Sequence, residues 1–462
     1  MRPNSRWCVV LLASMGAACG SSSGAPGDFD AEEPGDDASL GSERDAGSAI
    51  DGGRDTGTGS GSRPDSGTAE DGGSGEDSGA EVDSGSAQDS GSAHDSGAEV
   101  DSASAKDAGE DTGSGAGVDA GKDGGAGPDS GTTASGVHAV GNQIYDGTKA
   151  IRLLGVDRPG TEYACIQDSG IFDGPSDQAS ISAMLLWNVN SVRVPLNEDC
   201  WLSRNGAPAL YSGATYQSAI AAYVTLLLDN GIYPILDLHW TEDAGAAATG
   251  QQPMPDVNAT AFWTSVATLF KSQNKVVFDL FNEPFPDDNM DATSAWQCWE
   301  NGGSTCPGVG YTVVGMQAML TAVRNAGADN LVVLGGLEYS NDLSQWLTYE
   351  PTDPARNLAV SWHVYSNSNY TSNHTLSADA APVLAKVPIV ATEIGDGKNP
   401  PACNGTFITE VMDYLDAPGN GVPAQSYLAW SWSTDNMPSL ISDYTGTPRC
   451  DGATFKAHLL AQ

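Results

Sequence analysis

From residue 151 to the end of this chain, short apolar segments rich in β-branched residues alternate with longer segments whose apolar residues recur at helical spacing. The strand-like segments are 151–155, 189–196, 232–239, 276–284, 331–335, 358–365, 388–393 and 426–432. Helix-like segments begin at Ser176 and continue with 215–230, 260–272, 312–326, one near Leu343, 378–385, 407–415 and 453–460. Such alternation indicates parallel strands joined by crossover helices. We therefore predict the α/β class and a (β/α)8 TIM barrel, preceded by a β-hairpin at 137–154.

The fourth strand-like segment reads V-V-F-D-L-F-N-E-P, from Val276 to Pro284. Its β-branched start, short length and terminal proline favour a buried strand over a buried helix. Asp279 interrupts the apolar run, as a polar residue that points into a barrel centre does. We therefore expect Glu283 at the carboxyl end of a parallel strand, where α/β barrels carry their reactive groups.

A sharp change of composition divides the chain into a front part and one folded domain. Residues 1–19 have an arginine-containing start, an apolar core and small residues, which is typical of a bacterial export signal and too short for a membrane span. The end of this segment resembles a lipoprotein cleavage site, so Cys19 is the predicted lipidation site. Ordinary secretion is the alternative, because Gly16 stands where a larger aliphatic residue is usual. We predict a disordered linker at 20–135 and the folded domain at 136–462.

The predicted linker consists mainly of Asp, Ser, Gly and Ala, so it cannot bury enough apolar area to offset chain entropy. An Asp-Ser-Gly unit recurs in it every six residues, in register from Asp77 to Asp107. A calcium-binding solenoid is the alternative, but its glycine-rich repeat has another period and needs an apolar residue in each turn. We predict a flexible tether with a root-mean-square reach on the order of 60 Å.

The formal charge of -40 is divided about evenly between the linker and the folded domain. This acidity argues against nucleic acid or an anionic membrane as a partner. We predict a monomer that is extracellular or held at the cell surface, acts on a neutral partner, and touches a membrane only through a lipid on Cys19.

Six cysteines fall in the folded domain, and an even number in an exported domain indicates disulfides. The sequence leaves the pairing open, and an assignment that follows the predicted barrel order joins Cys165 with Cys200, Cys298 with Cys306, and Cys403 with Cys450. A zinc site is the alternative, but no pair has the short ligand spacing that such sites use.

Most of the predicted strands end in polar or aromatic residues that would face one mouth of the barrel. They include Arg193, His239, Trp240, Asn282, Glu283, His363, Tyr365, Glu393 and Trp430. Glu283 and Glu393 end the fourth and seventh strands, which lie across the barrel from each other. Two opposed carboxyl groups suit cleavage of a glycosidic bond, one protonated to release the leaving oxygen and one ionised to attack or to activate water.

The neighbouring residues suit the same reaction. Arg193 and Tyr365 are placed to hold the attacking carboxylate ionised, and Asn282 to bind the hydroxyl next to the anomeric carbon. Flat apolar faces suited to sugar rings belong to Trp201, Trp240 and Trp430. Taken singly, each residue is more often structural than functional, and their joint occurrence at successive strand ends favours a site.

The ordered set Arg193, His239, Asn282-Glu283-Pro284, His363-x-Tyr365, Glu393 and Trp430 resembles the family 5 glycoside hydrolases, the cellulase-like branch of a clan of retaining barrels. The resemblance covers the chain from about residue 137 onward. It implies that Glu283 is the acid/base and Glu393 the nucleophile, with Tyr365 and Arg193 as its partners. It also implies that His239 and Asn282 contact sugar hydroxyls, that His363 sits near the acid, and that Trp430 is the sugar platform. The family retains anomeric configuration, which predicts carboxyl groups about 5 to 5.5 Å apart. No cofactor and no metal are predicted.

Three functional hypotheses remain. The first is an exported endo-β-glycanase acting on β-1,4-glucan, with β-mannan as the nearest alternative substrate. The second is a non-catalytic surface carbohydrate-binding protein that has kept the fold, which loss of either glutamate would have indicated. The third is a metal-dependent barrel hydrolase using Asp237, His239 and His363, but such barrels usually draw two histidines from the first strand, and residues 151–157 contain none.

Overall fold

The computed structural model describes residues 135–242, 244–288, 292–366, 376–397 and 403–462. The predicted export signal with Cys19, and the predicted linker except Ser135, lie outside the described residues. No helix in the described part of the chain is both long enough and apolar enough to cross a membrane.

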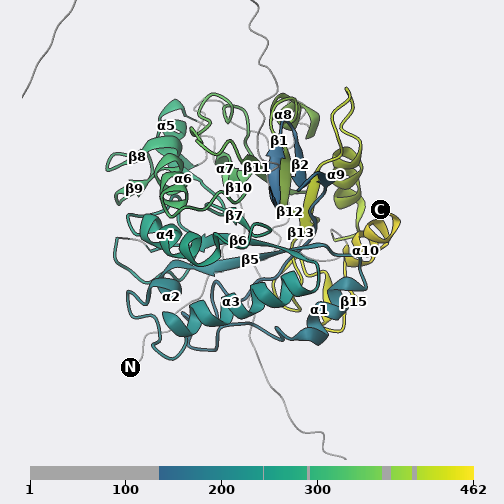
Figure 1. The fold of residues 1–462 in the computed structure, drawn as a ribbon, viewed down its shortest axis with the longest axis horizontal. Coiled ribbons are helices and arrows are strands. Elements are labelled where there is room, and N and C mark those ends of the chain that lie inside the picture. The colour runs from purple at the N-terminus through teal and green to yellow at the C-terminus, as the bar shows by residue number, and fades with distance from the viewer. Residues whose placement is uncertain (1–134, 243, 289–291, 367–375, 398–402) are drawn as a thin grey trace, which may run out of the picture. The chain divides into compact units, whose positions relative to one another are not determined.

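Within the described residues, eight parallel strands form a closed barrel, as predicted (Figure 1). In chain order they are β4 (Leu154–Asp157), β5 (Ser191–Asn197), β6 (Tyr233–Trp240), β7 (Val277–Asp279), β10 (Val332–Gly335), β11 (Leu358–Tyr365), β12 (Ile389–Gly395) and β13 (Ser426–Ala429). Each strand pairs with its neighbour in sequence, and β13 closes the ring on β4. Because all strands run the same way, their carboxyl ends share one mouth.

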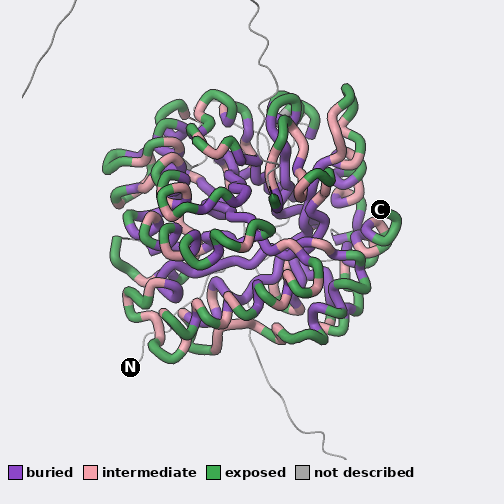
Figure 2. Tube along the Cα trace, viewed as in Figure 1, coloured by how far each residue is buried: buried purple, intermediate pink, exposed green. Residues whose placement is uncertain are grey.

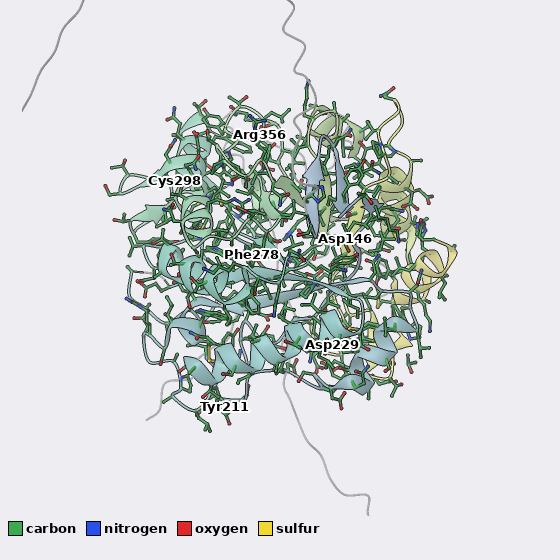
Figure 3. All side chains as sticks on the ribbon, viewed as in Figure 1. Asp146, Tyr211, Asp229, Phe278, Cys298 and Arg356 are labelled. Carbon is green, nitrogen blue, oxygen red and sulfur yellow. A yellow bond between two sulfur atoms is a disulfide. The ribbon has the colours of Figure 1, made fainter. Side chains whose placement is uncertain are left out.

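Helices surround this barrel and turn their apolar faces to it. The longer ones are α1 (Gln178–Leu185), α3 (Ala214–Asp229), α4 (Ala259–Phe270), α5 (Thr293–Asn301), α6 (Met316–Asn325), α8 (Leu376–Leu384), α9 (Thr406–Asp416) and α10 (Gly452–Ala461). In α4, Phe262, Val266 and Phe270 recur every four residues and are buried, as in an amphipathic helix. Figure 2 shows the barrel strands mostly buried and the outer surfaces of the helices largely exposed. Among the side chains labelled in Figure 3, Phe278 is fully buried, whereas Asp229 is exposed.

The amino end of the barrel is covered by a small antiparallel sheet of β1 (Val137–Val140), β2 (Gln143–Asp146) and β3 (Lys149–Ile151). Val137 and Ile144 from this sheet pack with Ile235 and Val277, which lie near the starts of barrel strands. The predicted N-terminal hairpin is present as part of this three-stranded sheet, in which β3 ends at Ile151 and the barrel begins separately at β4.

Other differences from the predicted elements lie in the connections. The strand predicted at 276–284 is much shorter as β7, because beyond Asp279 only single backbone bonds remain, such as Leu280 N–H to the Val333 carbonyl at 3.1 Å. The helix predicted near Leu343 is a series of turns. Short elements that were not predicted are α2 (Glu198–Leu202), η1 (Pro286–Asp288), α7 (Leu337–Ser340), and the pairs β8 (Gly302–Gly303) with β9 (Val313–Val314) and β14 (Ile441–Asp443) with β15 (Thr447–Pro448).

Three disulfides tie the connections at or near the barrel mouth in the described part of the chain. They join Cys165 to Cys200, Cys298 to Cys306, and Cys403 to Cys450, which are the pairs that the barrel order suggested. The first links the segment after β4 to α2, directly after β5. A domain with this cross-linking is consistent with an oxidising environment such as the cell exterior.

Candidate active site

Glu283 and His363 form a hydrogen-bonded pair at the mouth of the barrel. His363 lies on β11, and its Nδ1 is 2.8 Å from Oε1 of Glu283. Both side chains are almost completely buried. Asn282, next to Glu283, is fixed through its side-chain oxygen, which accepts a hydrogen bond from Nη2 of Arg193 at 2.8 Å. The Asn-Glu-Pro segment is therefore held in place although it extends beyond β7.

Glu393, on β12, has a donor at each carboxylate oxygen. Nη1 of Arg193 donates to Oε1 at 2.8 Å, and the hydroxyl of Tyr365 donates to Oε2 at 2.6 Å. Burial, reinforced by the charge of Glu393, raises the pKa of Tyr365 well above its ordinary value, so the phenol keeps its proton. These two donors stabilise negative charge on Glu393, which is the condition an attacking carboxylate needs.

Arg193, on β5, contacts four carboxylates inside the barrel. They are Asp157 at 3.1 Å, Asp237 at 3.1 Å, Asp279 at 3.0 Å and Glu393 at 2.8 Å. Burial raises the pKa of the three aspartates, to about 7 for Asp237, although the charge of Arg193 opposes the rise. Burial alone would lower the pKa of Arg193, but the carboxylates raise it well above its ordinary value. The guanidinium therefore stays charged, and its charge favours the ionised form of the carboxyl groups that it contacts.

The pKa of Glu283 is raised to about 7 by burial. The pKa of His363 is lowered to about 3, again chiefly by burial, so this histidine is neutral. Nε2 of His363 is buried and has no partner among the described residues, so we assign the ring proton to Nδ1, where Oε1 of Glu283 accepts it. The other carboxyl oxygen of Glu283 is then the one that can carry an acidic proton.

The two carboxyl groups lie close together. One oxygen of Glu283, one oxygen of Glu393 and a ring nitrogen of His363 are all within 4.8 Å of one another. Retaining glycosidases have carboxyl groups about 5 to 5.5 Å apart, whereas inverting enzymes leave about 6.5 to 9.5 Å for a water molecule. One oxygen of each glutamate lying within 4.8 Å of the other is compatible with the retaining arrangement. The same three side chains are also the group of described residues whose spacing could hold a metal ion.

Of the predicted sugar-binding residues, Trp430 and His239 lie together at the mouth. Their rings stack with centroids 5.7 Å apart and planes at 12°. Nδ1 of His239 is 2.6 Å from Asp237, and burial lowers the pKa of His239 to about 4. The indole N–H of Trp430 is buried and has no partner among the described residues. Trp240 is partly exposed beside them at the end of β6.

The prediction that Trp201 offers a face to sugar rings is wrong. Its side chain is fully buried in α2, edge-on to Tyr216 and Phe262, and its indole N–H donates to the Ser265 hydroxyl at 3.0 Å. The short helix after β5 turns this residue into the core beneath the barrel rim.

Several residues that define the site were not singled out as functional from the sequence. Asp157 and Asp279, which contact Arg193, are the main group, and a signal was present, since Asp279 interrupts an apolar strand and Asp157 ends the first one. Asp237, the third aspartate on Arg193, was considered from the sequence only as a metal ligand. The other such residue is Phe285, whose ring stacks on Tyr339 with centroids 4.7 Å apart; Tyr339 itself, after the fifth strand, was expected from the sequence to line the sugar-binding region. No local pattern connects these two residues, because they come from different strand ends.

A (β/α)8 barrel with two close carboxyl groups at its mouth defines a class, the barrel glycoside hydrolases. The sequence model described as cellulase, glycosyl hydrolase family 5, matches residues 156–436, and the chain belongs to this family.

Curated relatives of this chain are distant endoglucanases. The manganese dependent endoglucanase Eg5A of Phanerodontia chrysosporium is 25% identical over 239 residues, covering 48% of this chain and 55% of the relative. Endoglucanase EG-II of Hypocrea jecorina is 23% identical over 256 residues, covering 49% and 55%. The chain thus spans about half the length of the curated relatives it matches.

Solved structures share the fold. The β-glucanase SdGluc5_26A from Saccharophagus degradans, crystallised in complex with cellotetraose, has a TM-score of 0.54 and 20% sequence identity, with 71% of this chain and 94% of that chain covered. The cellulase Cel5C_n has a TM-score of 0.50 and 18% identity, with 70% and 91% covered. At these identities the likeness shows the fold alone.

Proposed function

We propose that this protein is an exported endo-β-glucanase that hydrolyses β-1,4-glucan with retention of configuration. The observation that carries the proposal is the contrast between two neighbouring carboxyl groups. Glu283 is buried and bonded to a neutral histidine, and its pKa is raised to about 7. Glu393 accepts bonds from an arginine and a phenol. Environments that differ in this way assign acid and nucleophile roles to a carboxyl pair.

In the first step Glu283 gives its proton to the glycosidic oxygen, and a carboxylate oxygen of Glu393 attacks the anomeric carbon. The bond to the leaving sugar breaks and a glycosyl ester forms on Glu393. In the second step Glu283, now ionised, takes a proton from water, and the water oxygen displaces Glu393 from the sugar. Arg193 and Tyr365 stabilise the charge that returns to Glu393.

The substrate part of the proposal is supported by the relatives. Both curated relatives are named endoglucanases, and one structural neighbour was solved with cellotetraose. Trp430, which stacks on His239, is an aromatic side chain of the type that sugar rings pack on. Other β-glycans, β-mannan first among them, are the alternative substrates, and a non-catalytic carbohydrate-binding role is the alternative function.

The decisive experiment is reducing-sugar release by the purified chain from carboxymethylcellulose, mannan, xylan and β-1,3-glucan. Glu283→Gln and Glu393→Gln are assayed beside it, with Glu410→Gln, an exposed glutamate on α9, as the matched control. We expect cleavage of the β-1,4-glucan, loss by orders of magnitude in the first two variants, and unchanged activity in the control. Equal activity in all variants refutes the assignment, and binding without cleavage favours the non-catalytic alternative.

The proposed mechanism uses no metal ion, although one relative is named manganese dependent. Nδ1 of His363 already donates a hydrogen bond to Glu283, and Glu283 transfers protons in this scheme. We therefore expect the rate to be unchanged by EDTA and by added Mn²⁺. A rate that EDTA abolishes and Mn²⁺ restores refutes this part of the proposal.

The proposed location rests on two features. The disulfides indicate an oxidising compartment, and residues 1–19 carry the pattern of an export signal. Incorporation of labelled palmitate in wild type but not in Cys19→Ala supports a lipid anchor. Release of unlabelled protein into the medium supports ordinary secretion.

A further inference from the structure

The connection that follows β10 has an unusual backbone. In α7, Glu338, Tyr339 and Ser340 have φ of 49°, 60° and 60°, so three consecutive non-glycine residues adopt the left-handed conformation. Such residues are strained and persist only where surrounding contacts hold them, which is frequent at functional sites. We call residues 338–341 the left-handed turn.

The left-handed turn bonds to the backbone on both sides of Glu283. The hydroxyl of Ser340 donates to the carbonyl of Asn282 at 2.7 Å, and Ser340 is fully buried. The backbone N–H of Tyr339 donates to the carbonyl of Pro284 at 3.0 Å. The ring of Tyr339 also stacks on Phe285, the next residue. Because β7 ends before this segment, the turn replaces part of the sheet hydrogen bonding that the segment lacks.

The same turn also bonds to the strand that carries His363. The side-chain amide of Asn341 donates to the carbonyl of His363 at 2.7 Å. The indole N–H of Trp362 donates back to the carbonyl of Asn341 at 3.0 Å. The turn therefore holds both members of the pair in which Nδ1 of His363 lies 2.8 Å from Glu283.

The end of β10 can accommodate the left-handed turn only because Gly335 and Gly336 have no side chains. A Cβ on Gly335 would lie 1.9 Å from the Ser340 hydroxyl oxygen, and a Cβ on Gly336 would lie 1.9 Å from the carbonyl oxygen of Asp342. The two glycines permit the turn to fold back against the strand and bring Ser340 to Asn282.

We propose that the left-handed turn is a device that positions the acid, and that Ser340 is a positioning residue acting through Asn282 on Glu283. This inference rests on the proposed function, because it takes Glu283 as the proton donor. Small errors in the position of a proton donor reduce its contribution to the rate steeply. Bonds that converge on the segment carrying Glu283 and on His363 contribute to offsetting the strain in the turn.

Ser340→Ala and Ser340→Gly test the proposal together. Both remove the hydroxyl, whereas glycine also relieves the left-handed strain, so a loss of activity shared by the two variants cannot come from strain. Ser344→Ala, an exposed serine in the following turns, is the matched control. For each protein, kcat/KM is measured on β-glucan and on 2,4-dinitrophenyl cellobioside, whose leaving group departs without a proton.

We expect kcat/KM on β-glucan to fall about tenfold in both Ser340 variants, because part of the acid contribution is lost. On the dinitrophenyl substrate it should stay close to wild type, and the control should be unchanged on both. Equal losses on the two substrates mean a general structural role, and full activity on β-glucan means no role; either outcome overturns the proposal.

A readout independent of activity separates this inference from the proposed function. Carbon-13 NMR titration of the Glu283 carboxyl reports its pKa directly in folded protein. We expect both Ser340 variants to lower this pKa by about half a unit or more, since a loosened segment admits water to the buried carboxyl. If the pKa of Glu283 is the same in wild type and in both Ser340 variants, the inference is refuted. If wild type cleaves neither substrate but the Ser340 variants still lower the pKa of Glu283, only the proposed function is refuted.

Discussion

Activity on a polysaccharide is expected to fall as the pH rises through about 7, because burial raises the pKa of Glu283 from 4.5 to about 7. At about 1.36 kcal/mol for each pKa unit, the protein favours the protonated carboxyl by roughly 3.4 kcal/mol. The acid works only when protonated, so the direction of the effect is loss at high pH. Above the pKa the protonated fraction falls about tenfold per pH unit, which gives about a hundredfold loss at pH 9.

The assay is kcat/KM between pH 5 and pH 10 on soluble β-glucan and on 2,4-dinitrophenyl cellobioside. The alkaline limb should appear with β-glucan and be absent with the activated substrate, which needs no proton. Asp237 also has a pKa of about 7, but it bonds Arg193 and His239 and would affect both substrates alike. The reasoning is refuted if both substrates show the same limb, or if the limb with β-glucan lies near pH 4.5.

Three further predictions concern single substitutions. Tyr365→Phe should lower kcat/KM about 10- to 100-fold with little change in melting temperature, because it removes a hydrogen bond to the charged Glu393. In Glu198→Gln, the free energy of unfolding measured with urea should depend less on pH than in wild type between pH 5 and pH 9. Burial raises the pKa of Glu198 and Asp256, so the stability of wild type falls as the pH rises toward those values, whereas an amide cannot ionise. Trp430→Ala should weaken cello-oligosaccharide binding about threefold to tenfold, measured by calorimetry in a Glu393→Gln background.

Each of these predictions has a result that contradicts it. Unchanged kcat/KM in the tyrosine variant would mean that its phenol does not support Glu393. A urea profile in which Glu198→Gln follows wild type at every pH would mean that Glu198 is already ionised. Unchanged binding in the tryptophan variant would place the sugar elsewhere in the mouth.

The order of the strands in the barrel could be predicted because each buried strand is a continuous apolar segment in the sequence. The strand predicted at 358–365 has the bounds of β11 in the structure. The residues predicted at the mouth come together because parallel strands bring their carboxyl ends to one side, so strand order alone determines which side chains meet.

The features that could not be predicted from the sequence depend on contacts between segments far apart in the chain. Trp201 lies in a helix of five residues, too short to show an apolar face in its spacing, and only packing against Phe262 reveals it as core. The left-handed turn has no sequence signal, since glycine is absent at 338–340 and the conformation is imposed by bonds to Asn282 and Pro284.

The cluster around Arg193 links the assembly of the active site to the completion of folding. Its carboxylate partners come from β4, β6, β7 and β12, and Glu393 lies 200 residues after the arginine in the chain. The cluster therefore forms only when strands far apart in the chain come together, and Glu393 can contact Arg193 only when β12 has paired in the barrel. A chain that ends before β12 lacks Glu393, so it contains neither this ion pair nor the second carboxyl group of the candidate site.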